Sequence, residues 1–151
     1  MSEPPHASSW AAPPEFYLDE NLAGKTLRRL LQDLGYTVHT PAELFGSKAE
    51  SEGVADEVWL RLVGERSWVV IGRDTRILER PSELDAYLRA KVHMFLFPGN
   101  ATRNQLIDIT TTTLIQICTR ATEAMPAVWR VRGGSHPHLE QLTRLTRKRN
   151  R

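Results

Sequence analysis

The stretch SWVVIGRD, residues 67–74, decides the fold that this sequence predicts. Val69, Val70 and Ile71 form an unbroken β-branched run with charged residues on both sides, which is typical of a strand. We therefore expect a strand over residues 67–72. An apolar run without alternation indicates that both faces of the strand are covered, as in a parallel sheet.

Strands and helices alternate along the chain on either side of this stretch. Leucines recur at positions i, i+3, i+4 and i+7 from Leu27, which indicates an amphipathic helix. Similar patterns predict strands at 15–18, 36–40 and 92–97, and helices at 27–34, 54–66 and 81–90. This alternation predicts an α/β fold with a mainly parallel four-stranded sheet, right-handed crossovers and helices on both faces.

The chain after residue 100 has a different pattern. Residues 104–125 have apolar residues at helical spacing and no turn residues, so we expect a helix there. Four consecutive threonines at 110–113 oppose this assignment, because β-branched residues are poor helix formers. Residues 127–142 contain a glycine turn between two short strand-like runs, which predicts a β-hairpin.

Length and composition indicate one globular domain between two tails. Hydrophobic residues make up 40% and charged residues 25% of the chain, which is enough to build a core. The Pro- and Ser-rich residues 1–14 predict a disordered arm, and residues 144–151 a basic tail. The domain is expected over residues 15–143.

Several protein classes are excluded by simple features. Cys118 is alone, so no disulfide framework can form within the chain. No apolar run reaches the ~20 residues needed to cross a bilayer. The start of the chain lacks the pattern of a secretion signal. We expect a cytoplasmic protein without a membrane partner, and the net charge of +2 does not by itself demand nucleic acid.

Acidic residues follow the predicted strands. Asp19 comes directly after the first strand and Asp74 follows the third. If these two strands are neighbours, both carboxylates lie at the same edge of the sheet, where functional groups of parallel sheets collect. Glu43 follows the second strand, and Glu20 is a weaker candidate beside Asp19. Carboxylates gathered at one edge repel each other unless a cation neutralises them, and oxygen ligands favour Mg²⁺ or Mn²⁺.

Asp56 is the remaining acid of interest, in the predicted helix 54–66. We expect the core stripe of this helix to be Val54, Val58 and Leu62, which would leave Asp56 between Leu60 and Val63. Asp56 can cap the helix or bind a ligand, and its spacing does not decide between them. For Asp19, Glu43 and Asp74 the alternative is an ordinary loop or capping acid.

Six short motifs resemble, in order and spacing, the PIN-like nuclease domains of VapC-type toxins. They are FYLDENL, AELFG, VADEVWL, WVVIGRDTRIL, PGNATRNQL and AVWRVRGG, and they extend over roughly residues 15–143. The resemblance implies a PIN-like three-layer α/β/α sandwich with a C-terminal helix and a β-hairpin.

The resemblance also implies a function. Such proteins are metal-dependent ribonucleases, usually the toxins of type II toxin–antitoxin pairs. An antitoxin protein inhibits them, in some cases with an arginine in the acidic site, and many dimerise. Residue by residue, the four catalytic acids would be Asp19, Glu43, Asp56 and Asp74. Asp19, Asp56 and Asp74 would bind Mg²⁺ or Mn²⁺, and Glu43 would help to position the attacking water.

Some positions depart from the pattern of the family. Many relatives carry a further acid after the fourth one, whereas Thr75 and Arg76 follow Asp74 here. This thin acidic set supports an alternative function as a catalytically weak or inactive interaction module that binds a partner through its acidic edge. A receiver-like phosphoacceptor domain is a third possibility, but the fourth strand is not followed by the lysine that such domains require.

Basic residues near these acids are candidates for substrate binding. Arg73 and Arg76 flank Asp74, and Lys25 lies at the start of the first helix. They could bind an RNA phosphate, or the two arginines could pair with neighbouring acids.

Overall fold

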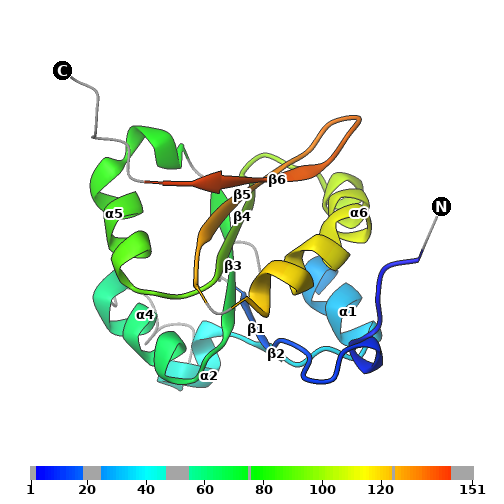
Figure 1. Cartoon of the computed structure of the whole chain (residues 1–151), viewed down its shortest axis with the longest axis horizontal. Coiled ribbons are helices and arrows are strands. Elements are labelled where there is room, and N and C mark those ends of the chain that lie inside the picture. Colours follow the sequence, from blue (N-terminus) through cyan, green and yellow to red (C-terminus); the bar gives the residue numbers. More distant parts are fainter. Residues whose placement is uncertain (1–2, 19–24, 47–54, 75, 124, 144–151) are drawn as a thin grey trace.

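A computed structural model describes residues 3–18, 25–46, 55–74, 76–123 and 125–143. A six-stranded sheet lies between two layers of helices (Figure 1). Its strand order is β2-β1-β3-β4-β5-β6, in which the first five strands are parallel and β6 is antiparallel to β5. The strands are β1 (Phe16–Leu18), β2 (Val38–His39), β3 (Val69–Asp74), β4 (Met94–Pro98), β5 (Val128–Arg132) and β6 (His138–Leu142).

The helices cover the two faces of the sheet. One layer holds α1 (Lys25–Asp33) and α6 (Arg103–Ala121), and the other holds α2 (Pro41–Phe45), α4 (Asp56–Glu65) and α5 (Pro81–Arg89) (Figure 1). Two short 3₁₀ segments, η1 (Ala7–Ser9) and η2 (Ile77–Glu79), complete the described elements. The predicted α/β sandwich is therefore confirmed, and the predicted hairpin extends the central sheet as its last two strands.

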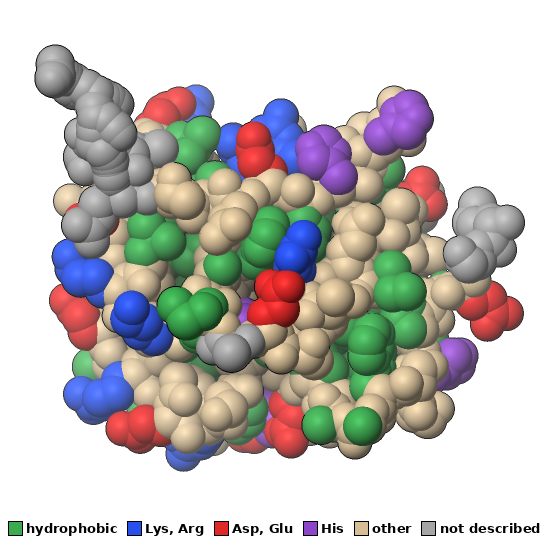
Figure 2. All heavy atoms as spheres, in the orientation of Figure 1, with side chains coloured by type: hydrophobic (Ala, Val, Ile, Leu, Met, Phe, Trp, Pro, Cys, Tyr) green, Lys and Arg blue, Asp and Glu red, His purple; other side chains and the backbone are tan. Residues whose placement is uncertain are grey.

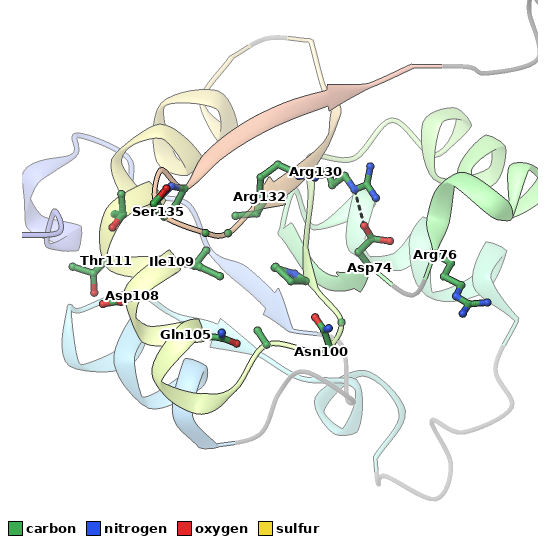
Figure 3. A pocket seen from close by; sticks show the side chains of 18 of the residues that line it. Asp74, Arg76, Asn100, Gln105, Asp108, Ile109, Thr111, Arg130, Arg132 and Ser135 are labelled. Carbon is green, nitrogen blue, oxygen red and sulfur yellow. Dashed lines mark hydrogen bonds and ion pairs between the residues drawn. The ribbon is translucent and has the colours of Figure 1, made fainter.

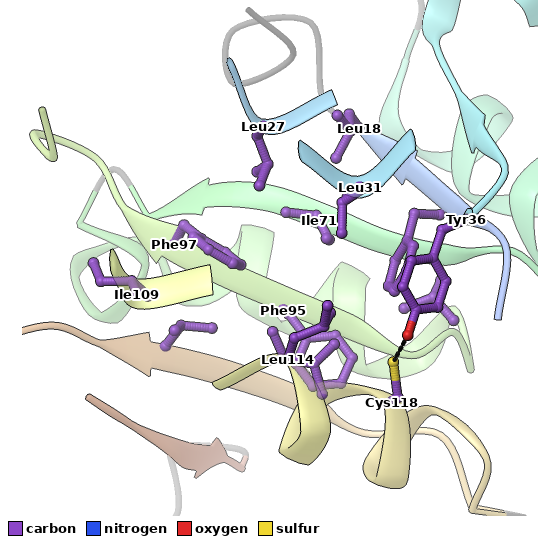
Figure 4. Packing of buried hydrophobic residues seen from close by; sticks show 14 of the residues in the cluster. Leu18, Leu27, Leu31, Tyr36, Ile71, Phe95, Phe97, Ile109, Leu114 and Cys118 are labelled. Carbon is purple, nitrogen blue, oxygen red and sulfur yellow. Dashed lines mark hydrogen bonds between the residues drawn. The ribbon is translucent and has the colours of Figure 1, made fainter. Parts of the chain in front are cut away.

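Each face of the sheet buries its own apolar cluster. Below α1 and α6, side chains of β1, β3 and β4 meet leucines of both helices and the thiol of Cys118 (Figure 4). Below α4 and α5, the cluster includes Tyr17, Leu60, Val63 and Val70. Successive strand residues point to opposite faces, so the apolar runs of β3 and β4 fill both clusters.

The structure corrects the core stripe expected for α4. Leu60 and Val63 are buried, whereas Val58 and Leu62 are only partly covered. Asp56 lies four residues before Leu60 and seven before Val63, so it shares the inward-facing stripe. A carboxylate at that position is directed toward the sheet layer instead of toward open solvent.

Helix α6 forms in spite of its threonines. Thr102 and Gln105 form a reciprocal capping box at its first turn. The hydroxyls of Thr110 and Thr113 donate to the carbonyls of Leu106 and Ile109, each at 2.7 Å. These bonds satisfy two polar groups inside the core and leave the methyl groups to pack.

The described part of the N-terminal arm, residues 3–14, packs on the domain, whereas the sequence predicted disorder for residues 1–14. Ala7 is buried, and its N–H donates to the carbonyl of Leu34 at 2.8 Å. The Tyr36 hydroxyl donates to the carbonyl of Pro5 at 2.8 Å and accepts from Trp10 Nε1 at 3.0 Å. An apolar anchor and an aromatic donor outweigh the polar composition of this segment.

No helix in the described parts of the chain is long and apolar enough to cross a membrane.

Candidate active site

Strands β1 and β3 are neighbours, as the sequence argument required. Leu18, the last residue of β1, pairs with Ile71 of β3. The strand order reverses here, because β2 lies on one side of β1 and β3 on the other. The carboxyl edge at such a reversal is where ligands bind in parallel sheets. Asp19 follows Leu18 in the sequence, but Asp19 and Glu20 lie outside the described residues.

Asp74, the last residue of β3, is held by contacts to both of its oxygens. Its side chain is only 10% exposed. Oδ1 accepts the backbone N–H of Ile77 at 2.9 Å, and Oδ2 accepts Arg130 Nε at 2.8 Å (Figure 3). Arg130 comes from β5, two strands away, and its side chain is 22% exposed. The carboxylate therefore already has a cationic partner within the chain.

Hydrogen bonds and close contacts fix the ends of β3 and β4. A side chain on Gly99 would place its Cβ 2.5 Å from the carbonyl oxygen of Asp74, so only glycine fits this contact. Arg73 Nε donates to the Gly99 carbonyl at 2.8 Å. Arg73 therefore acts in this structure as a clamp between two strand ends, the second of the two roles that the sequence left open.

A groove with a volume of about 1080 Å³ opens beside Asp74. Its walls are the first half of α6, the β5–β6 hairpin, the turn after β4 and residues 76–79 (Figure 3). The charged residues that line it are Asp74, Arg76, Glu79, Asp108, Arg130 and Arg132. Acidic and basic side chains are interspersed over this face of the molecule (Figure 2). The groove is polar and mixed in charge, without a dominant sign.

Asp56 begins α4 and is placed near β1. The preceding residue, Ala55, is the N-cap and makes no side-chain cap, and Asp56 Oδ1 accepts Trp59 Nε1 at 2.9 Å. The Trp59 ring stacks on Tyr17 of β1 with a centroid distance of 5.7 Å. Asp56 is thus oriented by a side chain that packs on β1, and not by a role as N-cap.

Glu43 is placed elsewhere. Its Oε2 lies 2.6 Å from His39 Nδ1, and the other ring nitrogen of His39 lies 2.7 Å from Glu15, which precedes β1. His39 pairs with Tyr17, which pairs with Val70, four residues before Asp74. At about 3.3 Å per residue, this separates the two acids by roughly 13 Å along the strands. The structure does not bring Glu43 to Asp74.

The other predicted basic residues differ in their surroundings. Arg76 lines the groove with a side chain that is 79% exposed and lies 3.8 Å from Glu79. Its backbone has a φ of 63°, a left-handed conformation at the turn after β3. Lys25 is the first residue of α1.

The described acids do not form a metal site as they stand. Among residues 3–18, 25–46, 55–74, 76–123 and 125–143, no three His, Cys, Asp or Glu side chains gather to hold an ion. Both oxygens of Asp74 are bound by donors, and a guanidinium beside it would repel a divalent cation. A ligand set at this edge therefore requires Asp19 or Glu20, which the structure does not describe.

Sequence reasoning missed Arg130 and Gly99. The position of Arg130 in AVWRVR, between apolar residues of alternating direction, was a signal that it leaves the core on one face. Its partner could not be inferred, because that depends on β5 joining the sheet next to β4. Gly99 was visible only as part of a turn.

Comparison with known families adds an independent finding. The family model described as "PIN like domain" matches residues 14–99, more than half of the chain. No curated protein and no solved structure gives a significant match. The match includes β1 through β4, and thus the reversal of strand order and Asp74. The chain therefore belongs to the PIN-like domain family, whose members are usually nucleases.

Proposed function

We propose that this protein is a ribonuclease that hydrolyses RNA phosphodiester bonds at the carboxyl edge of β1 and β3. The observation that carries the proposal is the position of Asp74. It is a largely buried carboxylate at the reversal of strand order, and it opens on a groove of about 1080 Å³. A concave polar site at this point of a parallel sheet is where the chemistry of such folds takes place.

Asp56 and Asp19 are the acids that we propose as the catalytic pair. Asp56 is directed inward and oriented by Trp59, and Asp19 follows β1 in the sequence. In the reaction, water attacks phosphorus, the phosphorus–oxygen bond to the leaving ribose breaks, and a carboxylate takes the proton of the water. Glu43 is not assigned a role in this step, because it is bound to His39 on the other side of the sheet.

A requirement for Mg²⁺ or Mn²⁺ is a separate part of the proposal. PIN-like nucleases generally use divalent metals. Asp19 and Asp56 would be the ligands, and the metal would supply positive charge at the phosphate. Removal of divalent ions with EDTA should abolish cleavage, and Mn²⁺ should restore it. Full activity in EDTA would contradict this part alone.

The Asp19→Asn variant tests the ribonuclease proposal. Cleavage of a labelled RNA by the purified protein should fall at least 100-fold, while the melting temperature stays equal or rises because repulsion between carboxylates is relieved. Asp33→Asn, on the last residue of α1, is the matched control and should cleave like the parent. Equal cleavage by Asp19→Asn and the parent would contradict the proposal.

The biological role that we propose is that of a toxin in a type II toxin–antitoxin pair, inhibited by a small antitoxin protein. The order of acidic motifs shared with VapC-type toxins supports it. Expression of the parent should arrest growth, and Asp19→Asn should relieve the arrest. A neighbouring gene product that restores growth and co-purifies would be the antitoxin. Size measurement on the same sample tests the proposed homodimer.

An inactive interaction module is the second candidate function. One observation favours it: the Asp74 carboxylate is already neutralised by Arg130, so the described site lacks the acidic cluster of an active nuclease. This function predicts tight binding of a partner protein, no cleavage of RNA under any metal condition, and no difference in growth between the parent and Asp19→Asn.

A further inference from the structure

We propose that Asp74 positions Arg130 in place of a metal ion, and that the Arg130 guanidinium binds a phosphate of the substrate strand. The second half of this inference rests on the ribonuclease function proposed above. The site would then carry one of its positive charges as a side chain of β5, in a part of the chain beyond the family match.

The first step of the argument is the contact set of Asp74. A carboxylate that binds a metal must direct a lone pair of at least one oxygen at the ion. Here a backbone N–H and a guanidinium N–H occupy the two oxygens at 2.9 and 2.8 Å. The side chain is 10% exposed, so water competes weakly for these bonds. Asp74 is therefore arranged as a partner for Arg130.

The second step is how Arg130 is held. It pairs with Leu96 of β4 and with Glu140 of β6 in the sheet register, and its side chain crosses β4 to reach Asp74. Its Nη1 lies 3.7 Å from Glu140. Carboxylates on both sides orient the guanidinium without a fork-to-fork bond to either. An arginine fixed in this way loses little rotamer entropy when it binds a further ligand.

The third step is what the guanidinium can do. Arg130 lines the groove beside Asp74, and guanidinium carries five N–H donors in a plane. Only Nε is used in the bond of 2.8 Å to Asp74, and the contact to Glu140 is long. Arginine suits phosphate because its fork matches two phosphate oxygens. The other groove arginines are less suited, because Arg76 and Arg132 are far more exposed.

Mn²⁺ binding, measured by electron paramagnetic resonance with Mn²⁺ alone, tests the first half. Asp74→Asn should bind Mn²⁺ within twofold of the parent, because Asp74 is not a ligand. Arg130→Gln should bind Mn²⁺ at least fivefold more tightly, because the carboxylate is freed from its cation. Arg130→Lys, which keeps the charge, should match the parent. Loss of Mn²⁺ binding in Asp74→Asn, or unchanged binding in Arg130→Gln, would overturn the inference.

RNA binding in EDTA tests the second half without any cleavage. The probe is a fluorescein-labelled, single-stranded 12-nucleotide RNA followed by anisotropy. Arg130→Gln should weaken binding at least fivefold, and Arg130→Lys at least twofold because the planar fork is lost. The control Arg89→Gln removes an arginine of α5 that lies 3.7 Å from Asp85, and it should bind like the parent. Equal binding by Arg130→Gln and the parent, or no binding by the parent, would overturn this half.

The two proposals fail in different ways. Binding that depends on Arg130 without any cleavage would keep this inference and refute the ribonuclease function. Cleavage that is lost in Asp19→Asn but unaffected in Arg130→Gln would do the opposite. Melting curves of both Arg130 variants establish that they are folded, and Arg130→Lys supplies the result if the glutamine variant does not fold.

Discussion

Asp74 and Glu43 were predicted from the same kind of evidence, but they lie in different parts of the molecule. Each follows a parallel strand, and each has a basic partner in the chain. Asp74 is bound to Arg130 at the mouth of a groove. Glu43 is bound to His39, whose ring stacks on Trp68 at 3.6 Å and also contacts Glu15 before β1.

The difference comes from strand length. β3 continues for six residues and delivers Asp74 to the carboxyl edge, whereas β2 has only two residues and ends level with Tyr17. A side chain that follows a short strand stays near the middle of the sheet. A position after a strand therefore predicts a site residue only if the strands reach the same level.

The largest stability effect is expected from Arg130→Ala, which breaks the Asp74 side of this comparison. It leaves a carboxylate that is 10% exposed without its charged partner. Removing one member of a fully buried pair costs about 3–5 kcal/mol, and partial exposure should reduce this to about 2 kcal/mol. Urea unfolding measures the change. A loss as small as that of an exposed pair would show that Arg130 does not hold Asp74.

A similar or slightly smaller effect is expected from Gly99→Ala, which disturbs Asp74 through its backbone. The new Cβ would lie 2.5 Å from the Asp74 carbonyl oxygen, so the strand ends must separate. Overpacking of this kind costs about 1–3 kcal/mol. The neighbouring change Asn100→Ala, at an exposed position, is the control and should be nearly neutral in the same urea measurement. Equal stability of the two variants would refute the close contact.

Glu43→Gln examines the other side of the comparison and should have a smaller effect. The Glu43 side chain is 48% exposed, so loss of its contact with His39 should cost under about 1 kcal/mol. Thermal unfolding should show a small decrease. A loss as large as that of Arg130→Ala would mean that Glu43 has a burial or a partner that the structure does not give it.

The smallest effect concerns His93, which precedes β4 at the same end of the sheet as His39 precedes the level of Asp74. Burial lowers the pKa of His93 below 6.5, although a hydrogen bond to the Glu123 carbonyl opposes this. Below pH 6.5 the unfolded chain therefore binds the proton more readily than the folded chain. The free energy of unfolding should fall as the pH drops from 6.5 toward the lower folded-state pKa. His93→Gln should reduce this slope, and an unchanged slope would contradict the assignment.

Most of the fold could be predicted from the sequence because it depends on local patterns. The leucine spacing from Leu27 and the β-branched run of β3 were enough to identify their elements. The stripe of α4 could not be assigned, since two stripes were possible and only packing on Tyr17 and Val70 selects Leu60 and Val63. The arm before residue 15 was mistaken for disorder because Trp10 has its partner, Tyr36, far along the chain.

The candidate site was predictable only in part. The adjacency of β1 and β3 follows from the general behaviour of parallel sheets and is confirmed. The bond between Asp74 and Arg130 joins residues that are 56 positions apart and passes over β4. No local pattern encodes such a contact, since it requires the register of three strands at once.

Side-by-side cleavage of one RNA by the parent, Asp74→Asn and Glu43→Gln, in Mn²⁺, tests the account most directly. We predict that Asp74→Asn loses at least 100-fold in rate, because Arg130 loses the carboxylate that positions it. Glu43→Gln should remain within threefold of the parent. Loss of activity in Glu43→Gln to the level of Asp74→Asn, or full activity in Asp74→Asn, would contradict the assignment of the site to the Asp74 edge.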